Sequence, residues 1–219
     1  MAGAAVLLAV PALAAPEAAA TAKPEMRIPV LRLDTLTPEQ KQASDALQDA
    51  FGVTFKDRTP AGPLGAAIVD PGFGQPMAMM FKHFHRDPAV DQRLFELVVL
   101  TTARSWDAQF EWYAHEAPAL KAGLSKAVVE AIRLGQTPVF AHEDEKAVYA
   151  MTLEVQNRRK LSQASYDRAV QLLGREATVK YLFAAAYYDA TSVVVVGLDM
   201  QMPPGLADPL PPLARTAAR

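Results

Sequence analysis

A histidine and two glutamates form the group of residues best suited to proton transfer. Glu111 and His115 are four residues apart in a segment with helical periodicity, so their side chains share one helix face. Glu96 lies in the preceding predicted helix, and the short connection makes the two helices antiparallel neighbours. A carboxylate beside an imidazole sets its tautomer and charge, as general acid–base catalysis requires. We therefore predict that His115 moves a proton and that Glu96 and Glu111 control its charge.

Side chains close to this group could bind a substrate. Arg104 could hold a substrate carboxylate through two parallel hydrogen bonds. The wall of a pocket for a ring compound could be formed by Trp106, Trp112 and Tyr113. The alternatives are structural: a cap or salt bridge at a helix end for Arg104, and a place in the core for both tryptophans.

The composition excludes several classes of function. The chain has 219 residues and no cysteine, which excludes disulfides, thiolate metal sites and cysteine nucleophiles. Lys and Arg together number 22 against 24 Asp and Glu, so the net charge of −2 does not favour nucleic acid as a partner. Hydrophobic residues make up 51% of the chain, enough for the core of one domain. The expected partner is a small organic molecule.

Helices must position these side chains. The periodicity, caps and glycine stops predict helices over residues 38–50, 91–104, 106–122, 125–135, 142–160, 162–174 and 175–200. Residues 51–76 contain five glycines and four prolines and are predicted to form a long loop. The valine run 193–196 favours a strand by propensity, but its alanine-rich setting predicts a helix. The expected class is all-α, a single-domain bundle of about six or seven helices.

The two ends of the chain are predicted to lie outside the helical domain. An apolar run over residues 4–10, followed by Ala12-Leu13-Ala14, is typical of a secretory signal peptide, so residues 1–22 are assigned to a signal peptide or disordered leader. Residues 23–200 form the domain, and 201–219 a proline-rich, extended tail. The apolar stretch 181–198 contains Asp189, which indicates a core helix rather than a membrane anchor. A periplasmic or secreted location is expected, with the cytoplasm as the alternative.

Several short motifs resemble the carboxymuconolactone decarboxylase family of the alkylhydroperoxidase D-like superfamily. The motifs are Glu96-Leu97, Ala103-Arg104, Phe110-Glu111-Trp112 with His115 three residues later, and Gly123-Leu124. The resemblance extends through residues 36–40, Gly62-Pro63 and 149–167, and so covers nearly all of the chain after the leader. It implies an all-α fold that assembles as trimers or hexamers, with active sites near subunit contacts.

The resemblance also implies a reaction class. The peroxidase branch of the superfamily carries two cysteines before its histidine, which fall on Ala108 and Glu111 here, so thiol peroxidase activity is not expected. Its relay glutamate falls on Glu96, which is present. The decarboxylase that names the family removes a carboxylate from a lactone of aromatic-compound breakdown and reprotonates the enolate at carbon. A cofactor-free, carboxy-lyase-like enzyme using His115 is therefore expected.

An exported leader does not suit a central catabolic decarboxylase, so the substrate is left open among a small lactone, a ring acid and another aromatic-derived compound.

Two alternatives to this enzyme stay open. The first alternative is a non-catalytic protein that binds small molecules on the same fold. The second is a metal-dependent enzyme that uses His83 and His85, with His142 as a further ligand. Our leading interpretation requires no metal.

Overall fold

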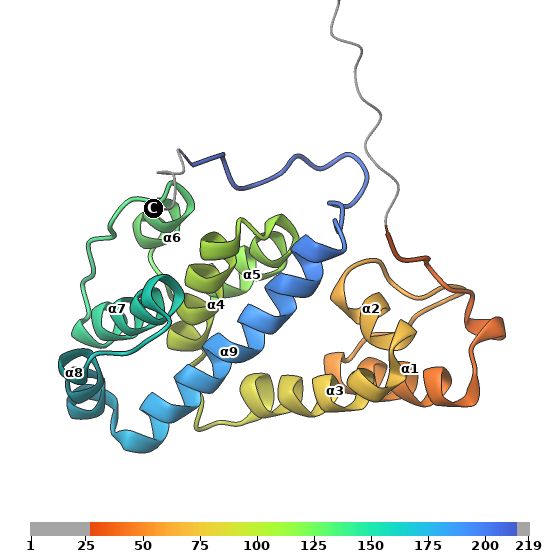
Figure 1. Cartoon of the computed structure of the whole chain (residues 1–219), viewed down its shortest axis with the longest axis horizontal. Helices are drawn as coiled ribbons and strands as arrows, with labels where there is room; N and C mark the ends of the chain where they lie inside the picture. Colours follow the sequence, from red (N-terminus) through yellow and green to blue (C-terminus); the bar gives the residue numbers. More distant parts are fainter. Residues whose placement is uncertain (1–26, 214–219) are drawn as a thin grey trace, which may run out of the picture.

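The computed structural model describes residues 27–213 and confirms the predicted all-α, single-domain bundle (Figure 1). This part of the chain forms nine α-helices, one short 3-10 helix, Leu33–Thr35, and no strand. The helices are α1 Pro38–Phe51, α2 Pro63–Val69, α3 Pro71–Arg86, α4 Gln92–Trp106, α5 Gln109–Lys121, α6 Lys126–Arg133, α7 Glu143–Arg158, α8 Gln163–Leu173 and α9 Arg175–Gly197. The predicted leader, residues 1–22, lies outside the described residues.

Side-chain caps explain where several helices begin. The Thr37 hydroxyl accepts a hydrogen bond from the backbone N–H of Gln40, whose side chain in turn accepts one from the Thr37 N–H. The hydroxyls of Ser125 and Ser162 each accept one hydrogen bond from a backbone N–H of the first turn and so cap α6 and α8, and the Asp91 carboxylate caps α4. The predicted starts of α1, α6 and α8 are confirmed because local hydrogen bonds determine them.

The prediction of a long loop over residues 51–76 is wrong for its second half. Residues 63–69 form α2 and residues 71–76 the first turns of α3, whereas residues 53–62 contain no helix. Gly74 is buried in α3, where an added Cβ would lie 2.6 Å from the Ala67 carbonyl oxygen and 2.7 Å from the Ala43 Cβ. Glycine here allows helices to approach closely instead of marking a loop. The two additional helices raise the number to nine.

The predicted helix over residues 106–122 begins later than expected. Trp106 is the last residue of α4, and α5 begins at Gln109. Asp107 separates the two helices in a left-handed conformation, φ 53°, and its backbone N–H donates to the carbonyl oxygens of Ala103 and Arg104. This tight turn places α5 directly against α4, as the argument for the Glu96–His115 contact requires.

Helix α4 is the centre of the bundle. All its residues from Leu94 to Arg104 are buried, and α5, α6, α7 and α9 pack around it. Helices α1, α2 and α3 form a second group that packs around Leu47 and Ile68. Figure 1 shows α9 running between this group and the α4–α8 group. The two groups therefore meet along α9.

Helix α9 is the one described helix that is long and apolar enough to cross a membrane by length and composition. It packs against α4, α5, α7 and α8, as a core helix does. The valine run 193–196 lies inside it, which confirms the predicted helix. Asp189 accepts a hydrogen bond from the Trp106 indole at 2.6 Å.

The proline-rich tail, as far as residue 213, contains no helix and folds back over the chain's own helices (Figure 1). Gln109 exchanges hydrogen bonds with the backbone of Leu210, and Arg133 donates to the Pro209 carbonyl oxygen. The absence of a helix from the described tail agrees with its proline content. These contacts fix the tail beside α5 and α6.

Candidate functional site

A cavity of about 470 Å³ lies where the α1–α3 group meets α4, α5 and α9. Its wall is mostly apolar and aromatic, with Phe51, Phe81 and Phe110 among its members. All three predicted catalytic residues, Glu96, Glu111 and His115, line this cavity. A mainly apolar pocket with a few converging polar groups is typical of a small-molecule site.

The three residues form a compact group. His115 Nδ1 donates to Glu96 Oε2 at 2.8 Å, and His115 Nε2 lies 3.9 Å from Glu111 Oε2. The His115 side chain is 12% exposed, and both glutamate side chains are 3% exposed. The hydrogen bond to Glu96 fixes the ring, so Nε2 is the nitrogen left for proton transfer.

Burial and charge act in opposite directions on His115. Burial alone disfavours the imidazolium, but the Glu96 carboxylate, its hydrogen bond and Glu111 together raise the pKa of His115 above its ordinary value. Burial raises the pKa of Glu111, and the nearby imidazolium only partly offsets this effect. Compared with water, the site therefore favours the imidazolium form of His115, beside Glu96, and disfavours the carboxylate form of Glu111.

Glu111 also has an incomplete set of hydrogen bonds. Its Oε1 atom is buried and has no hydrogen-bond partner among the described residues. Buried polar atoms are nearly always hydrogen-bonded, because burial without a partner costs about 1–3 kcal/mol. Glu111 therefore lines the cavity with a carboxyl group that still has hydrogen-bonding capacity.

A second polar pair in the cavity was missed by the sequence analysis. His85 in α3 and Tyr188 in α9 both line it, and His85 Nε2 lies 3.3 Å from the Tyr188 hydroxyl. The His85 ring stacks on Phe81 and lies 6.2 Å from the His115 ring, centroid to centroid. No local spacing could have joined two residues 103 positions apart.

Burial, and then the charge of His115, lower the pKa of His85 to about 4. Between about pH 6.5, the ordinary value, and pH 4 the unfolded chain binds a proton at His85 that the folded chain does not. The free energy of unfolding therefore falls as the pH is lowered through this window. We expect His85→Gln to reduce the loss between pH 7 and 4.5 by about 2 kcal/mol, as measured by urea denaturation.

The matched control for this prediction is His83→Gln, because His83 is exposed on the same helix. Its stability should follow the wild-type pH dependence. A pH dependence that His85→Gln leaves unchanged would show that His85 is charged in the folded protein at pH 4.5.

The structure places the four predicted substrate-binding residues elsewhere. None of Arg104, Trp106, Trp112 and Tyr113 lines the cavity. Arg104 pairs with Asp107 at 2.9 Å and donates to the Pro211 carbonyl oxygen of the tail. Trp106 binds Asp189, Trp112 lies fully in the core, and Tyr113 is 44% exposed beside Phe110. We correct the expectation that they surround the same ligand.

The histidines of the metal-dependent alternative are dispersed. His85 faces the cavity, His83 is exposed on α3, and His142 precedes the first turn of α7. Over residues 27–213 no group of three or more His, Asp or Glu side chains is arranged to hold a metal ion. The predicted spacing of His83 and His85 thus does not produce a shared ligand set.

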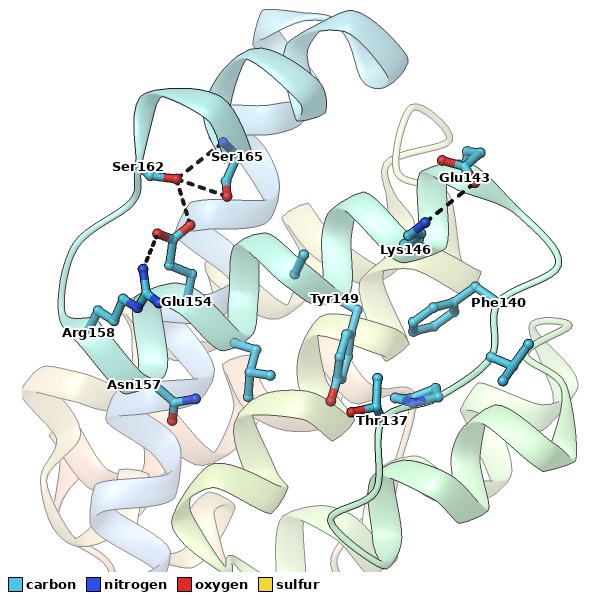
Figure 2. Close-up of a pocket in the computed structure, with 14 residues that line it drawn as sticks. Thr137, Phe140, Glu143, Lys146, Tyr149, Glu154, Asn157, Arg158, Ser162 and Ser165 are labelled. Carbon is cyan, nitrogen blue, oxygen red and sulfur yellow. Dashed lines mark hydrogen bonds and ion pairs between the residues drawn. The ribbon is translucent and has the colours of Figure 1, made fainter. Parts of the chain in front are cut away.

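A larger hollow, about 760 Å³, lies on α7, α8 and the segment 137–140 (Figure 2). Figure 2 shows Glu154 accepting a hydrogen bond from Ser162 and lying close to Arg158. Lys146 is similarly near Glu143. The charged groups of this hollow pair with one another at the surface, and none of the predicted site residues lines it. We therefore place the candidate site in the smaller cavity.

Comparison with known proteins identifies no family for this chain. No protein-family model matches the chain, and no curated protein matches it either.

Proposed function

We propose that the protein is a cofactor-free enzyme that transfers protons at a small ring compound, a lactone, ring acid or other aromatic-derived molecule, through His115. One observation carries this proposal: an imidazole held by Glu96 at 2.8 Å, with the partly unpaired Glu111 beside it, on the wall of an apolar cavity. The resemblance to the carboxymuconolactone decarboxylase family supports the same chemistry. Decarboxylation, isomerisation and related lyase reactions all share the enolate step.

The geometry suggests a role for each of the three residues in the reaction. As the imidazole, His115 Nε2 takes a proton from the carbon next to a carbonyl group, and the electrons of the broken C–H bond enter the enolate. As the imidazolium, it returns a proton to carbon. When protonated, a form that burial favours, the Glu111 carboxyl donates a hydrogen bond to the enolate oxygen, and Glu96 stabilises the imidazolium. No oxidant or co-reactant is needed.

The test is exchange of carbon-bound hydrogen with solvent. The protein is incubated in D₂O with a panel of lactones, ring ketones and ring acids, and loss of the proton next to the carbonyl group is followed by NMR. We expect at least one panel member to exchange faster than in buffer alone. Compounds that bind, shown by thermal stabilisation, yet never exchange or lose carbon dioxide would favour the non-catalytic binding protein.

Family membership, export and assembly belong to the same proposal. We infer membership in the carboxymuconolactone decarboxylase family, export to the periplasm or medium, and assembly as a trimer or hexamer. Exposed apolar side chains such as Met79, 72% exposed, and Phe183, 62% exposed, support assembly because large apolar side chains at a surface favour contact with another chain. Sedimentation of the purified protein would measure the subunit number.

A further inference from the structure

The described residues that line the cavity provide no free cation that could pair with an anionic ligand. No Lys or Arg is among the described residues that line it, and of its two imidazoles burial lowers the pKa of His85 to about 4, which leaves His115 as the cationic group. That imidazolium is already paired with Glu96 at 2.8 Å. A ligand carboxylate would therefore enter an apolar site that contains no unpaired cation. Burying an unpaired charge costs far more than burying an uncharged polar group.

The polar atoms that remain suit an uncharged carbonyl compound. Glu111 lines the cavity and its buried Oε1 has no partner, and a carboxyl group that is protonated can donate a hydrogen bond to a carbonyl oxygen. His85 uses Nε2 toward Tyr188, and its Nδ1 makes no hydrogen bond within residues 27–213. Stacking on Phe81 and the edge contact with Phe95 hold the His85 ring in place. The cavity thus presents two fixed groups for neutral oxygen atoms.

We propose that this cavity selects an uncharged ring compound bearing a carbonyl oxygen, and that His85 contacts this ligand as a second hydrogen-bonding group alongside Glu111. This inference rests on the proposed function and narrows its substrate class. A lactone or ring ketone fits the site, and a ring acid does not. Enolisation or isomerisation of a neutral substrate then takes precedence over decarboxylation, whose substrate must carry a carboxylate.

A matched pair of ligands tests the charge preference. Coumarin is an uncharged bicyclic lactone, and coumarin-3-carboxylate adds one negative charge to the same ring system. Calorimetric titration of the full chain at pH 7 should give coumarin at least a tenfold higher affinity than its carboxylate. Equal or tighter binding of the carboxylate would overturn the proposal, and so would the absence of coumarin binding.

Three variants test the residues. His85→Phe keeps a stacking ring and removes the hydrogen-bonding nitrogens, so we expect about a tenfold loss of coumarin affinity. The control His83→Gln should bind coumarin as the wild type does. Ala61→Arg adds a cation at an exposed position of the cavity wall. It should reduce the ratio of the affinity for coumarin to the affinity for its carboxylate. Unchanged coumarin affinity in a folded His85→Phe would contradict the role of His85.

The outcomes separate this inference from the proposed function. Selective coumarin binding without hydrogen exchange in any compound would retain the substrate class and reject the enzyme. Exchange that occurs with ring acids alone would retain proton transfer through His115 and reject the preference for uncharged ligands.

Discussion

His115→Gln should lower the rate of solvent exchange into a substrate by about 10²–10⁴-fold, the usual contribution of a general acid–base group. Glutamine retains a hydrogen-bond donor toward Glu96 but cannot accept and return a proton near neutral pH. The affinity for the ligand should change much less than the rate, because His115 acts on the C–H bond. The measurement is the NMR exchange rate in D₂O at saturating substrate.

Two further measurements distinguish a loss of catalysis from a loss of the folded structure. His142→Gln alters an exposed histidine outside the cavity and should exchange at the wild-type rate. Since His115→Gln leaves the buried Glu96 without its cationic partner, the double variant Glu96→Gln/His115→Gln should be compared, with folding checked by circular dichroism. A folded variant that lacks His115 and still exchanges at the wild-type rate would refute the proposed function.

The pH dependence of the exchange rate gives an independent test of the direction in which the pKa of His115 is shifted. The Glu96 carboxylate, its hydrogen bond and Glu111 together more than offset burial and raise the pKa of His115, so the imidazolium persists above about pH 6.5, the ordinary value for histidine. The His115-dependent change in rate should therefore occur above that pH. A change centred below it would mean that burial dominates over Glu96 in the folded protein.

The sequence was most informative where the interactions are local. Glu111 and His115 are one turn apart, and a short turn connects their helix to that of Glu96, so periodicity was enough to bring these three residues together. Capping residues such as Thr37 and Ser162 similarly determine helix starts through hydrogen bonds within three residues. Contacts between residues this close in the sequence depend less on how the remaining chain packs.

Distant contacts account for what could not be predicted. Arg104 was expected to bind substrate, but the Pro211 carbonyl oxygen of the tail, 107 positions away, accepts a hydrogen bond from its guanidinium. His85 meets Tyr188 across a comparable separation. Neither partner can be chosen from spacing, because both depend on how the α1–α3 group and the tail pack on the bundle.

The helices within residues 51–76 were predicted to be loop for a different reason, which a substitution can test. In α3, Gly74→Val should lower the free energy of unfolding by about 3 kcal/mol, at the upper end of the range for overpacked sites. An added Cβ would meet the Ala67 carbonyl oxygen at 2.6 Å and the Ala43 Cβ at 2.7 Å. Both atoms belong to packed helices and cannot move alone, so the three helices would have to separate.

Gly72→Val is the matched control, because Gly72 lies in the same helix but is exposed, and an added Cβ comes no closer than 3.4 Å to the Asp70 side chain. Its stability in urea denaturation should stay within about 0.5 kcal/mol of the wild type. Since α1, α2 and α3 supply Phe51, Leu64 and His85 to the cavity wall, Gly74→Val should also weaken ligand binding. Equal stability of the two variants would mean that the glycines mark a loosely packed segment, as their number in the sequence suggested.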